Sequence, residues 1–295
     1  MTAESGTRRR PMKNVVTRVL VFAIGIPALI GLILLLPDWY HLPFNILVIV
    51  ATGIASAELA GILAARPEGY RIPRTIAFGL GAVLPITALI ALFVGGTPYS
   101  LLTVVVTITA VILGFQGFRR DERHFAGIIP LLTTVLFLLV YPGLFGSYLV
   151  RLSGFAHSTA LIVVFVASVY LNDSLAYAIG MLFGKRNERL VPVSPNKSLA
   201  GFIAGFVTSV VVTVAAALVL PEVFPGSPVR AAVLGAAVGC AAIVGDLAES
   251  ALKRSAVVKD SGDIIPGRGG LLDSVDSPLF SAFVFYYLYL VLFIG

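Results

Sequence analysis

The sequence is dominated by a succession of apolar runs, each about as long as a bilayer's hydrocarbon core is thick. Hydrophobic residues occupy 58% of the 295 positions, and the mean hydropathy is +0.99. A helix of roughly 20 apolar residues crosses a membrane with every backbone hydrogen bond satisfied. The pattern excludes a soluble globular protein and predicts an all-α polytopic membrane protein.

These runs predict about nine transmembrane helices. Their limits are 15–36, 42–65, 75–94, 98–117, 127–149, 158–183, 199–220, 229–252 and 274–294. The fifth run is the least regular, because Pro130 and Pro142 interrupt it. The first run is too long for the apolar core of a cleaved signal peptide, so it is interpreted as a spanning helix.

The basic residues predict how the helices are oriented. Nineteen of the 21 Lys and Arg residues lie in the N-terminal segment up to Arg18 and in loops 66–74, 118–126, 184–198 and 253–273. This asymmetry predicts a cytoplasmic N-terminus and a C-terminus on the opposite side. The net charge of +6 is then a topology signal, and we expect no nucleic-acid partner. The expected location is the cell (inner) membrane, with an active site that faces the cytoplasm.

The acidic residues within the apolar runs predict that the two halves of one integrated membrane domain have different roles. Residues 1–14 form a basic cytoplasmic tail, residues 15–150 N-terminal scaffold helices, and residues 151–295 a C-terminal catalytic region. The first five spans carry one acid, Glu58, whose role as a functional or structural contact stays open. The later spans carry Asp173, Asp246 and Glu249, and carboxylates at such depth are costly and usually functional.

The residues that most often bind metals or form disulfides give no signal of their own. Cys240 is the single cysteine, so a disulfide framework and a thiolate metal site are excluded. His41, His124 and His157 lack the spacing of metal ligands. We expect each histidine to be a loop residue.

The segment 245–277 holds the densest charge in the chain. It contains ten charged side chains, out of 21 basic and 15 acidic residues in all. Asp246, Glu249 and Lys253 share one face of a helix, and Asp273 and Asp276 repeat the three-residue step. A glycine-rich loop lies between these groups, and its N–H groups are suited to anions. The segment predicts a cage for divalent metal and phosphates; the alternative is a solvated loop.

Two shorter motifs precede this segment. Residues 172–185 read N-D-S-L-A-Y-A-I-G-M-L-F-G-K, with Asp173 and Tyr177 on one helical face and with Gly180 and Gly184 spaced for close helix packing. Residues 194–201 read S-P-N-K-S-L-A-G, in which Ser194 and Pro195 predict a turn and helix start. The Lys and Ser that follow are either an interfacial anchor or a binding group.

The three motifs, in this order, resemble the phosphatidate cytidylyltransferase (CDP-diacylglycerol synthase) family. The resemblance covers roughly residues 170–280. The matching residues are Asp173, Ala176, Tyr177, Gly180, Gly184, Lys185, Ser194, Pro195, Lys197, Gly201, Ser250, Lys253, Arg254, Lys259, Asp260, Gly262, Pro266, Gly267, Gly269, Gly270, Asp273 and Asp276. The chain departs from the family's pattern at Ala200, usually Glu, at Arg268, usually His, and at Ser274, usually Arg.

The resemblance implies transfer of CMP from CTP to phosphatidate, which gives CDP-diacylglycerol and pyrophosphate in phospholipid biosynthesis. The residues that would act in catalysis are Asp246, Lys253, Arg254, Lys259, Asp260 and Asp276. Those that would bind substrate are Asp173, Tyr177, Lys185, Ser194, Lys197, Ser198, Gly267, Arg268, Gly269 and Gly270. Those that would hold metal are Asp246, Glu249, Asp273 and Asp276.

The implied cofactor is Mg²⁺, with a second, monovalent cation left open, and the implied partners are CTP, phosphatidate and membrane lipid. A homodimer is also left open. One alternative is a CTP-dependent lipid kinase or a cytidylyltransferase-like paralogue with changed or lost activity. The other is a secondary transporter. The crowding of acids at one edge and the lack of an evident repeat count against transport.

Overall fold

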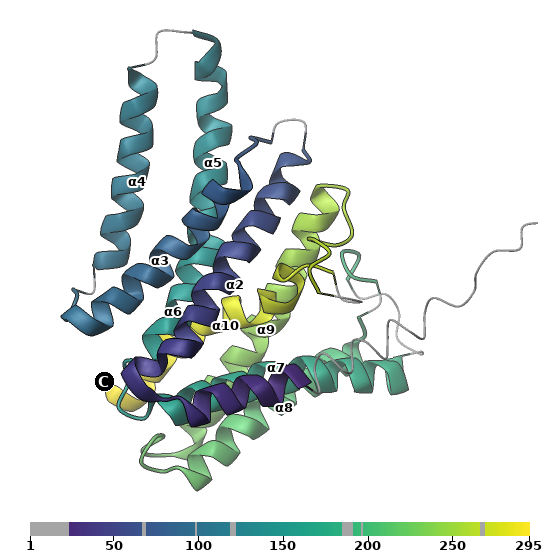
Figure 1. Cartoon of the computed structure of the whole chain (residues 1–295). Coiled ribbons are helices and arrows are strands. Elements are labelled where there is room, and N and C mark those ends of the chain that lie inside the picture. Colours follow the sequence, from purple (N-terminus) through teal and green to yellow (C-terminus); the bar gives the residue numbers. More distant parts are fainter. Residues whose placement is uncertain are drawn as a thin grey trace, which may run out of the picture.

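The protein is a bundle of helices whose axes differ widely in direction (Figure 1). The computed structural model describes residues 24–66, 69–97, 99–118, 122–184, 191–195, 197–265 and 269–295. After a first helix at Ile24–Leu35, the elements are α2 (Asp38–Ala64), α3 (Arg74–Val94), α4 (Ser100–Gly117), η1 (Glu122–Gly127), α5 (Ile128–Leu138), η2 (Leu139–Leu144), α6 (Phe145–Leu152), α7 (Ser158–Phe183), α8 (Leu199–Val219), α9 (Pro228–Ser255), α10 (Leu272–Tyr289) and η4 (Leu290–Ile294).

The all-α membrane architecture is confirmed. Within the described ranges, eight helical segments are long and apolar enough to cross a membrane, and they coincide with the second to ninth predicted spans. The helix at Ile24–Leu35 is shorter, and positions 15–23 of the first predicted span lie outside the described residues. The described ranges therefore contain eight clear spans, and part of the first predicted span lies outside them.

The fifth span is continuous despite its two prolines. Pro130 lies in the first turn of α5, where a backbone N–H has no partner within the helix. Pro142 lies in the π-helical segment η2, which connects α5 to α6. A wide turn of this kind re-routes backbone hydrogen bonds around the residue that lacks an N–H. Residues Phe125–Leu152 consequently form one candidate span.

Small residues bring α7, α8 and α9 close together. A side chain at Gly205 would collide with Asn172, and one at Gly184 would meet Ser198 at 2.8 Å. Asn172 Nδ2 donates to Ser209 Oγ at 2.9 Å, so a buried hydrogen bond locks α7 to α8. The predicted packing role of the glycines in the 172–185 motif is confirmed.

Aromatic contacts join the two halves of the chain. Phe280 of α10 packs against Tyr141 of η2 and Phe145 of α6, with ring centroids 5.4 and 5.1 Å apart. α10 also contacts α2 and α9. The last helix is therefore held between elements from both ends of the sequence. In contrast, α4 lies at the edge of the bundle, and Leu101 is its one buried residue (Figure 1).

A cluster of uncharged polar side chains lies where α2 and α7 begin. This neutral network consists of His41, Asn45, Ser153, Ser158 and Thr159. Asn45 Nδ2 donates to Tyr40 O at 2.6 Å and accepts from Ser153 Oγ at 3.2 Å. His41 Nε2 lies 3.1 Å from Ser158 Oγ and 3.2 Å from Thr159 Oγ1. His41 lies in the non-helical turn near the start of α2, with a φ of +55°, so its expected place in a connection agrees with the structure; the turn is buried, and His41 is 1% exposed.

Candidate functional site

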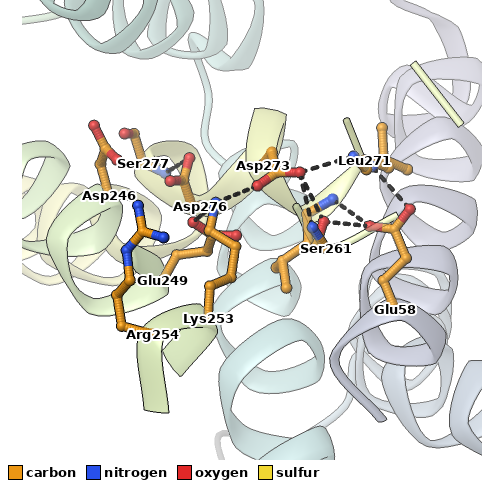
Figure 2. A network of polar contacts seen from close by, with 12 residues as sticks. Glu58, Asp246, Glu249, Lys253, Arg254, Ser261, Leu271, Asp273, Asp276 and Ser277 are labelled. Atoms are coloured by element: carbon orange, nitrogen blue, oxygen red, sulfur yellow. Dashed lines mark hydrogen bonds and ion pairs between the residues drawn. The ribbon is translucent and has the colours of Figure 1, made fainter. Parts of the chain in front are cut away.

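The C-terminal end of α9 meets the N-terminal end of α10 in a set of charged side chains (Figure 2). Lys253 lies between two carboxylates: its Nζ is 2.6 Å from Glu249 Oε2 and forms a second ion pair with Asp273 Oδ1. Glu249 is 1% exposed. We call the following group the charged network: Glu58, Lys197, Asp246, Glu249, Lys253, Ser261, Asp273 and Asp276.

Asp273 organises the loop between these helices. Its Oδ2 accepts from the N–H of Gly270 at 2.7 Å and from the N–H of Ser261 at 3.2 Å. Further along, Ile265 and Gly269 exchange two backbone hydrogen bonds, and Gly269 has a φ of +115°, which favours glycine. Several backbone N–H groups that were predicted to bind phosphate therefore already donate hydrogen bonds to other groups of the protein. A phosphate could bind the N–H of Gly270 only by displacing the carboxylate of Asp273.

Glu58 enters the same loop from α2. Its Oε1 accepts from the N–H of Leu271 at 2.9 Å, and its Oε2 accepts from the N–H of Leu272 at 2.8 Å. Ser261 Oγ lies 3.0 Å from Glu58 Oε2 and 3.0 Å from Asp273 Oδ2, so its proton can serve either acid. The sequence left the role of Glu58 open; the structure makes it a contact of the charged loop.

The three sequence motifs come together around this network. Lys197 of the second motif forms an ion pair with Asp246 of the third. Ser277 Oγ lies 3.5 Å from Asp173 Oδ1 of the first motif, and Arg254 Nε lies 3.5 Å from the carbonyl oxygen of Val193, next to the second motif. Segments separated by more than 100 residues in the sequence therefore contribute to one site.

The predicted metal ligands do not all share one cationic partner. Glu249 and Asp273 flank Lys253 (Figure 2), whereas Asp246 forms an ion pair with Lys197. Asp276 is 4% exposed and accepts from the N–H of Ser277 at 2.7 Å. Glu249 Oε1 is buried and has no hydrogen-bond partner among the described residues. One buried carboxylate oxygen of the network therefore receives no hydrogen bond from the described residues.

These carboxylates fit Mg²⁺ in one particular way. Among the residues that the structure describes, no three His, Cys, Asp or Glu side chains form a metal-holding cluster. Mg²⁺ commonly binds one or two carboxylates and takes its other ligands from substrate phosphate and water. Asp246 and Asp276 could supply carboxylates in this mode, and Lys197 would then share Asp246 with the metal ion or release it.

The other predicted site residues surround the network less closely. Tyr177, Arg254, Lys259 and Asp260 are exposed. Ser194 lies in a turn, where its carbonyl oxygen accepts from the N–H of Lys197 at 3.1 Å. The predicted helix start at Ser194 is wrong: the cap of α8 is Ser198, whose hydroxyl accepts from the N–H of Gly201 at 3.1 Å. Lys185, Gly267 and Arg268 lie outside the described residues.

Sequence reasoning also missed a buried hydroxyl from the first half of the chain. Tyr141, in the π-helical segment η2, is 3% exposed, and its hydroxyl has no hydrogen-bond partner in the described part of the protein. Its ring packs against Phe280 of α10, one turn after Asp276. The interruption of the fifth apolar run by Pro142 was the signal available in the sequence, because π-helical turns often occur at functional sites.

Comparisons with known proteins agree with the geometry. Residues 16–292 match the model of the cytidylyltransferase family. The chain is 38% identical to the uncharacterized protein YnbB of Escherichia coli over 43% of this chain and 42% of that protein. It is 33% identical to phosphatidate cytidylyltransferase of Aquifex aeolicus over 51% of this chain and 54% of the relative. It is 33% identical to the Helicobacter pylori enzyme of that name over 77% and 79%.

The chain thus matches about half the length of the first two relatives and about four-fifths of the third. The family match extends over the spans of both halves, well beyond the three motifs from which the sequence resemblance was drawn. The chain belongs to the cytidylyltransferase family.

Proposed function

We propose that this protein is a phosphatidate cytidylyltransferase, which transfers CMP from CTP to phosphatidate and releases pyrophosphate. The observation that carries the proposal is the convergence of three separated motifs, through Lys197–Asp246, Lys253–Asp273 and Ser277–Asp173. The family membership and the names of the relatives support the reaction type. The apolar helices suit a lipid substrate whose acyl chains stay in the bilayer.

The chemistry needs positioning and charge compensation more than proton transfer. A phosphate monoester loses its second proton with a pKa of about 6, so the phosphatidate oxygen is largely anionic near neutral pH. That oxygen forms a bond to the α-phosphorus of CTP, while the bond from this phosphorus to the bridging oxygen breaks and pyrophosphate leaves. Two polyanions must therefore be held together and in line.

Each part of the network has a role in this proposal. Lys197 and Arg254 would bind phosphate oxygens, and Lys253 would add positive charge beside the acids. Asp246 and Asp276 would hold Mg²⁺, which supplies electrostatic stabilisation of the transferred and leaving phosphates. Lys253 also balances the negative charges of Glu249 and Asp273, so the two carboxylates repel each other less. The distribution of basic loops supports a cytoplasmic active site, where CTP is available.

The test is a transfer assay on purified protein with phosphatidate, Mg²⁺ and CTP labelled either in the cytosine ring or at the γ-phosphate. We expect the ring label, and not the γ-phosphate, to become lipid-extractable. Asp246→Asn and Asp276→Asn should lower the transfer about 100-fold or more, while Glu222→Gln, at an exposed acid in the loop before α9, should leave it unchanged. Lipid label from the γ-phosphate alone would indicate a kinase and contradict the proposal, and so would folded protein that transfers neither label.

A further inference from the structure

We propose that Glu58 is a positioning residue of the active site: it fixes the N-terminus of α10, and through it the carboxylates of Asp273 and Asp276. This inference rests on the proposed function and assigns a role to the half of the chain that the sequence predicts to be scaffold. The contacts that carry it are three polar groups of the 261–272 segment that converge on one carboxylate (Figure 2).

The first step is the chemistry of a helix N-terminus. The first amides of α10 have no carbonyl partner within the helix, and the helix dipole concentrates positive charge there. Glu58 places one carboxylate oxygen on the N–H of Leu271 and the other on the N–H of Leu272. An acid from α2, more than 200 residues earlier in the chain, therefore provides the cap that α10 lacks in its own sequence.

The second step is the shape of the loop around Glu58. A side-chain carbon at Gly262 would approach Glu58 Oε1 to 2.7 Å, and one at Gly270 would collide with Glu58 and Ser261. The two glycines thus let the backbone close around the carboxylate. Since Gly262 and Gly270 belong to the family-like motif, their contact with Glu58 accounts for part of that motif.

The third step links Glu58 to the acids of the site. Ser261 Oγ lies within hydrogen-bond distance of both Glu58 and Asp273, and Asp273 pairs with Lys253. Leu272 is the first residue of α10, and Asp276 follows one turn later. A shift of the helix N-terminus would move both aspartates. Glu58 already accepts hydrogen bonds from the N–H groups of Leu271 and Leu272. We therefore expect substrate phosphate to bind to the cationic side chains of the network and not to this helix N-terminus.

The experiment combines kinetics with a local probe. Glu58→Gln keeps the shape of the side chain but turns one acceptor into an N–H₂ group that faces a backbone N–H. We expect kcat to fall about 10- to 100-fold, because small displacements of catalytic groups have effects of that size. The KM for CTP should change less than about threefold, since Glu58 does not touch substrate. Ser261→Ala should lower kcat less, and the double variant should be less than additive. Glu222→Gln is the matched control.

The local probe is a nitroxide spin label read by electron paramagnetic resonance. In a Cys240→Ala background, the label is attached at Asp263→Cys in the loop or at Glu222→Cys before α9, both exposed positions. Glu58→Gln should increase mobility at position 263 only. Unchanged mobility at 263, or an equal increase at both positions, would overturn the proposal, as would an unchanged kcat. The label does not depend on catalysis, so it still tests the role of Glu58 if the wild type transfers no cytidylyl group.

Discussion

The charged network and the neutral network are both partly buried polar clusters that involve α2, yet they differ in kind. Asn45 and Glu58 stand 13 residues apart on this helix, which corresponds to about 20 Å along its axis. Asn45 joins uncharged groups through hydrogen bonds to Tyr40 and Ser153. Glu58 joins a cluster that contains lysines and further carboxylates. One helix thus contributes to two polar clusters with different chemistry.

The difference indicates what each cluster does. Uncharged polar groups that form hydrogen bonds with one another can be buried at a chain reversal at a modest cost in free energy. Buried carboxylates are far more costly unless paired, and Glu249 retains an oxygen without a hydrogen-bond partner among the described residues. Such a cost is typical of a binding site for cations or substrate. Substitutions in the charged network should therefore lower activity, whatever their effect on stability, whereas those in the neutral network should lower stability and leave activity nearly unchanged.

Replacing Lys253 should have the largest effect. Lys253→Met removes the cation between Glu249 and Asp273, both of which are nearly inaccessible to solvent. A buried ion pair that loses one partner costs about 3–5 kcal/mol. We expect a marked fall in Tm in detergent together with loss of CMP transfer. Adding Glu249→Gln should recover part of the Tm but not the activity.

Lys259→Met, at an exposed lysine, is the stability control. An equal Tm for Lys253→Met and Lys259→Met would contradict the proposal that Lys253 balances the charges of the two buried acids.

Replacing Asp276 should separate activity from stability. Asp276→Asn removes a charge that is buried at 4% exposure, so the cost of burying a charged group falls. We expect Tm to stay the same or rise, while kcat/KM drops about 100-fold or more, as when a preorganised electrostatic group is lost. Circular dichroism and transfer assays on the same preparation measure both. A lower Tm with nearly normal kcat/KM would show that Asp276 is structural and would remove the contrast between the networks.

Replacing Asn45 should show the reverse behaviour. Asn45→Ala removes the hydrogen bond to Tyr40 O and the acceptor for Ser153 Oγ. Left unsatisfied, such buried groups cost about 1–3 kcal/mol. Asn45 also holds a turn in which Trp39, Tyr40 and His41 have positive φ values of 53–58°. We expect a lower Tm and a kcat/KM within about threefold of wild type. Thr109→Val, which removes a bond within α4 alone, should change Tm less.

How much the sequence could predict differs between the two networks. Hydropathy locates the spans because a bilayer demands long apolar helices, and the family-like motifs identify Lys253, Asp273 and Asp276. The capping of α10 by Glu58 could not be predicted, since it depends on how α2 and α10 pack across a separation of 213 residues. The burial of His41 was missed for the same reason: a histidine in a polar connection gives no sign of burial until its partners on α7 are known.

The smallest expected effect concerns the turn that follows α9 in the charged region. Val257 has a φ of +57° and is 93% exposed, an unfavourable conformation for a β-branched residue. The turn is closed by the N–H of Val258, which donates to Lys253 O at 2.9 Å.

Val257→Gly relieves strain of about 1–2 kcal/mol, and the greater freedom of glycine in the unfolded chain offsets about 0.5–1 kcal/mol of this. We expect a Tm that rises by a few degrees and a kcat that is equal or slightly lower. Val257→Ala keeps a Cβ and should gain less. If Val257→Gly instead lowered Tm, the valine would stabilise the turn, and its positive φ would not be a source of strain beside Lys253.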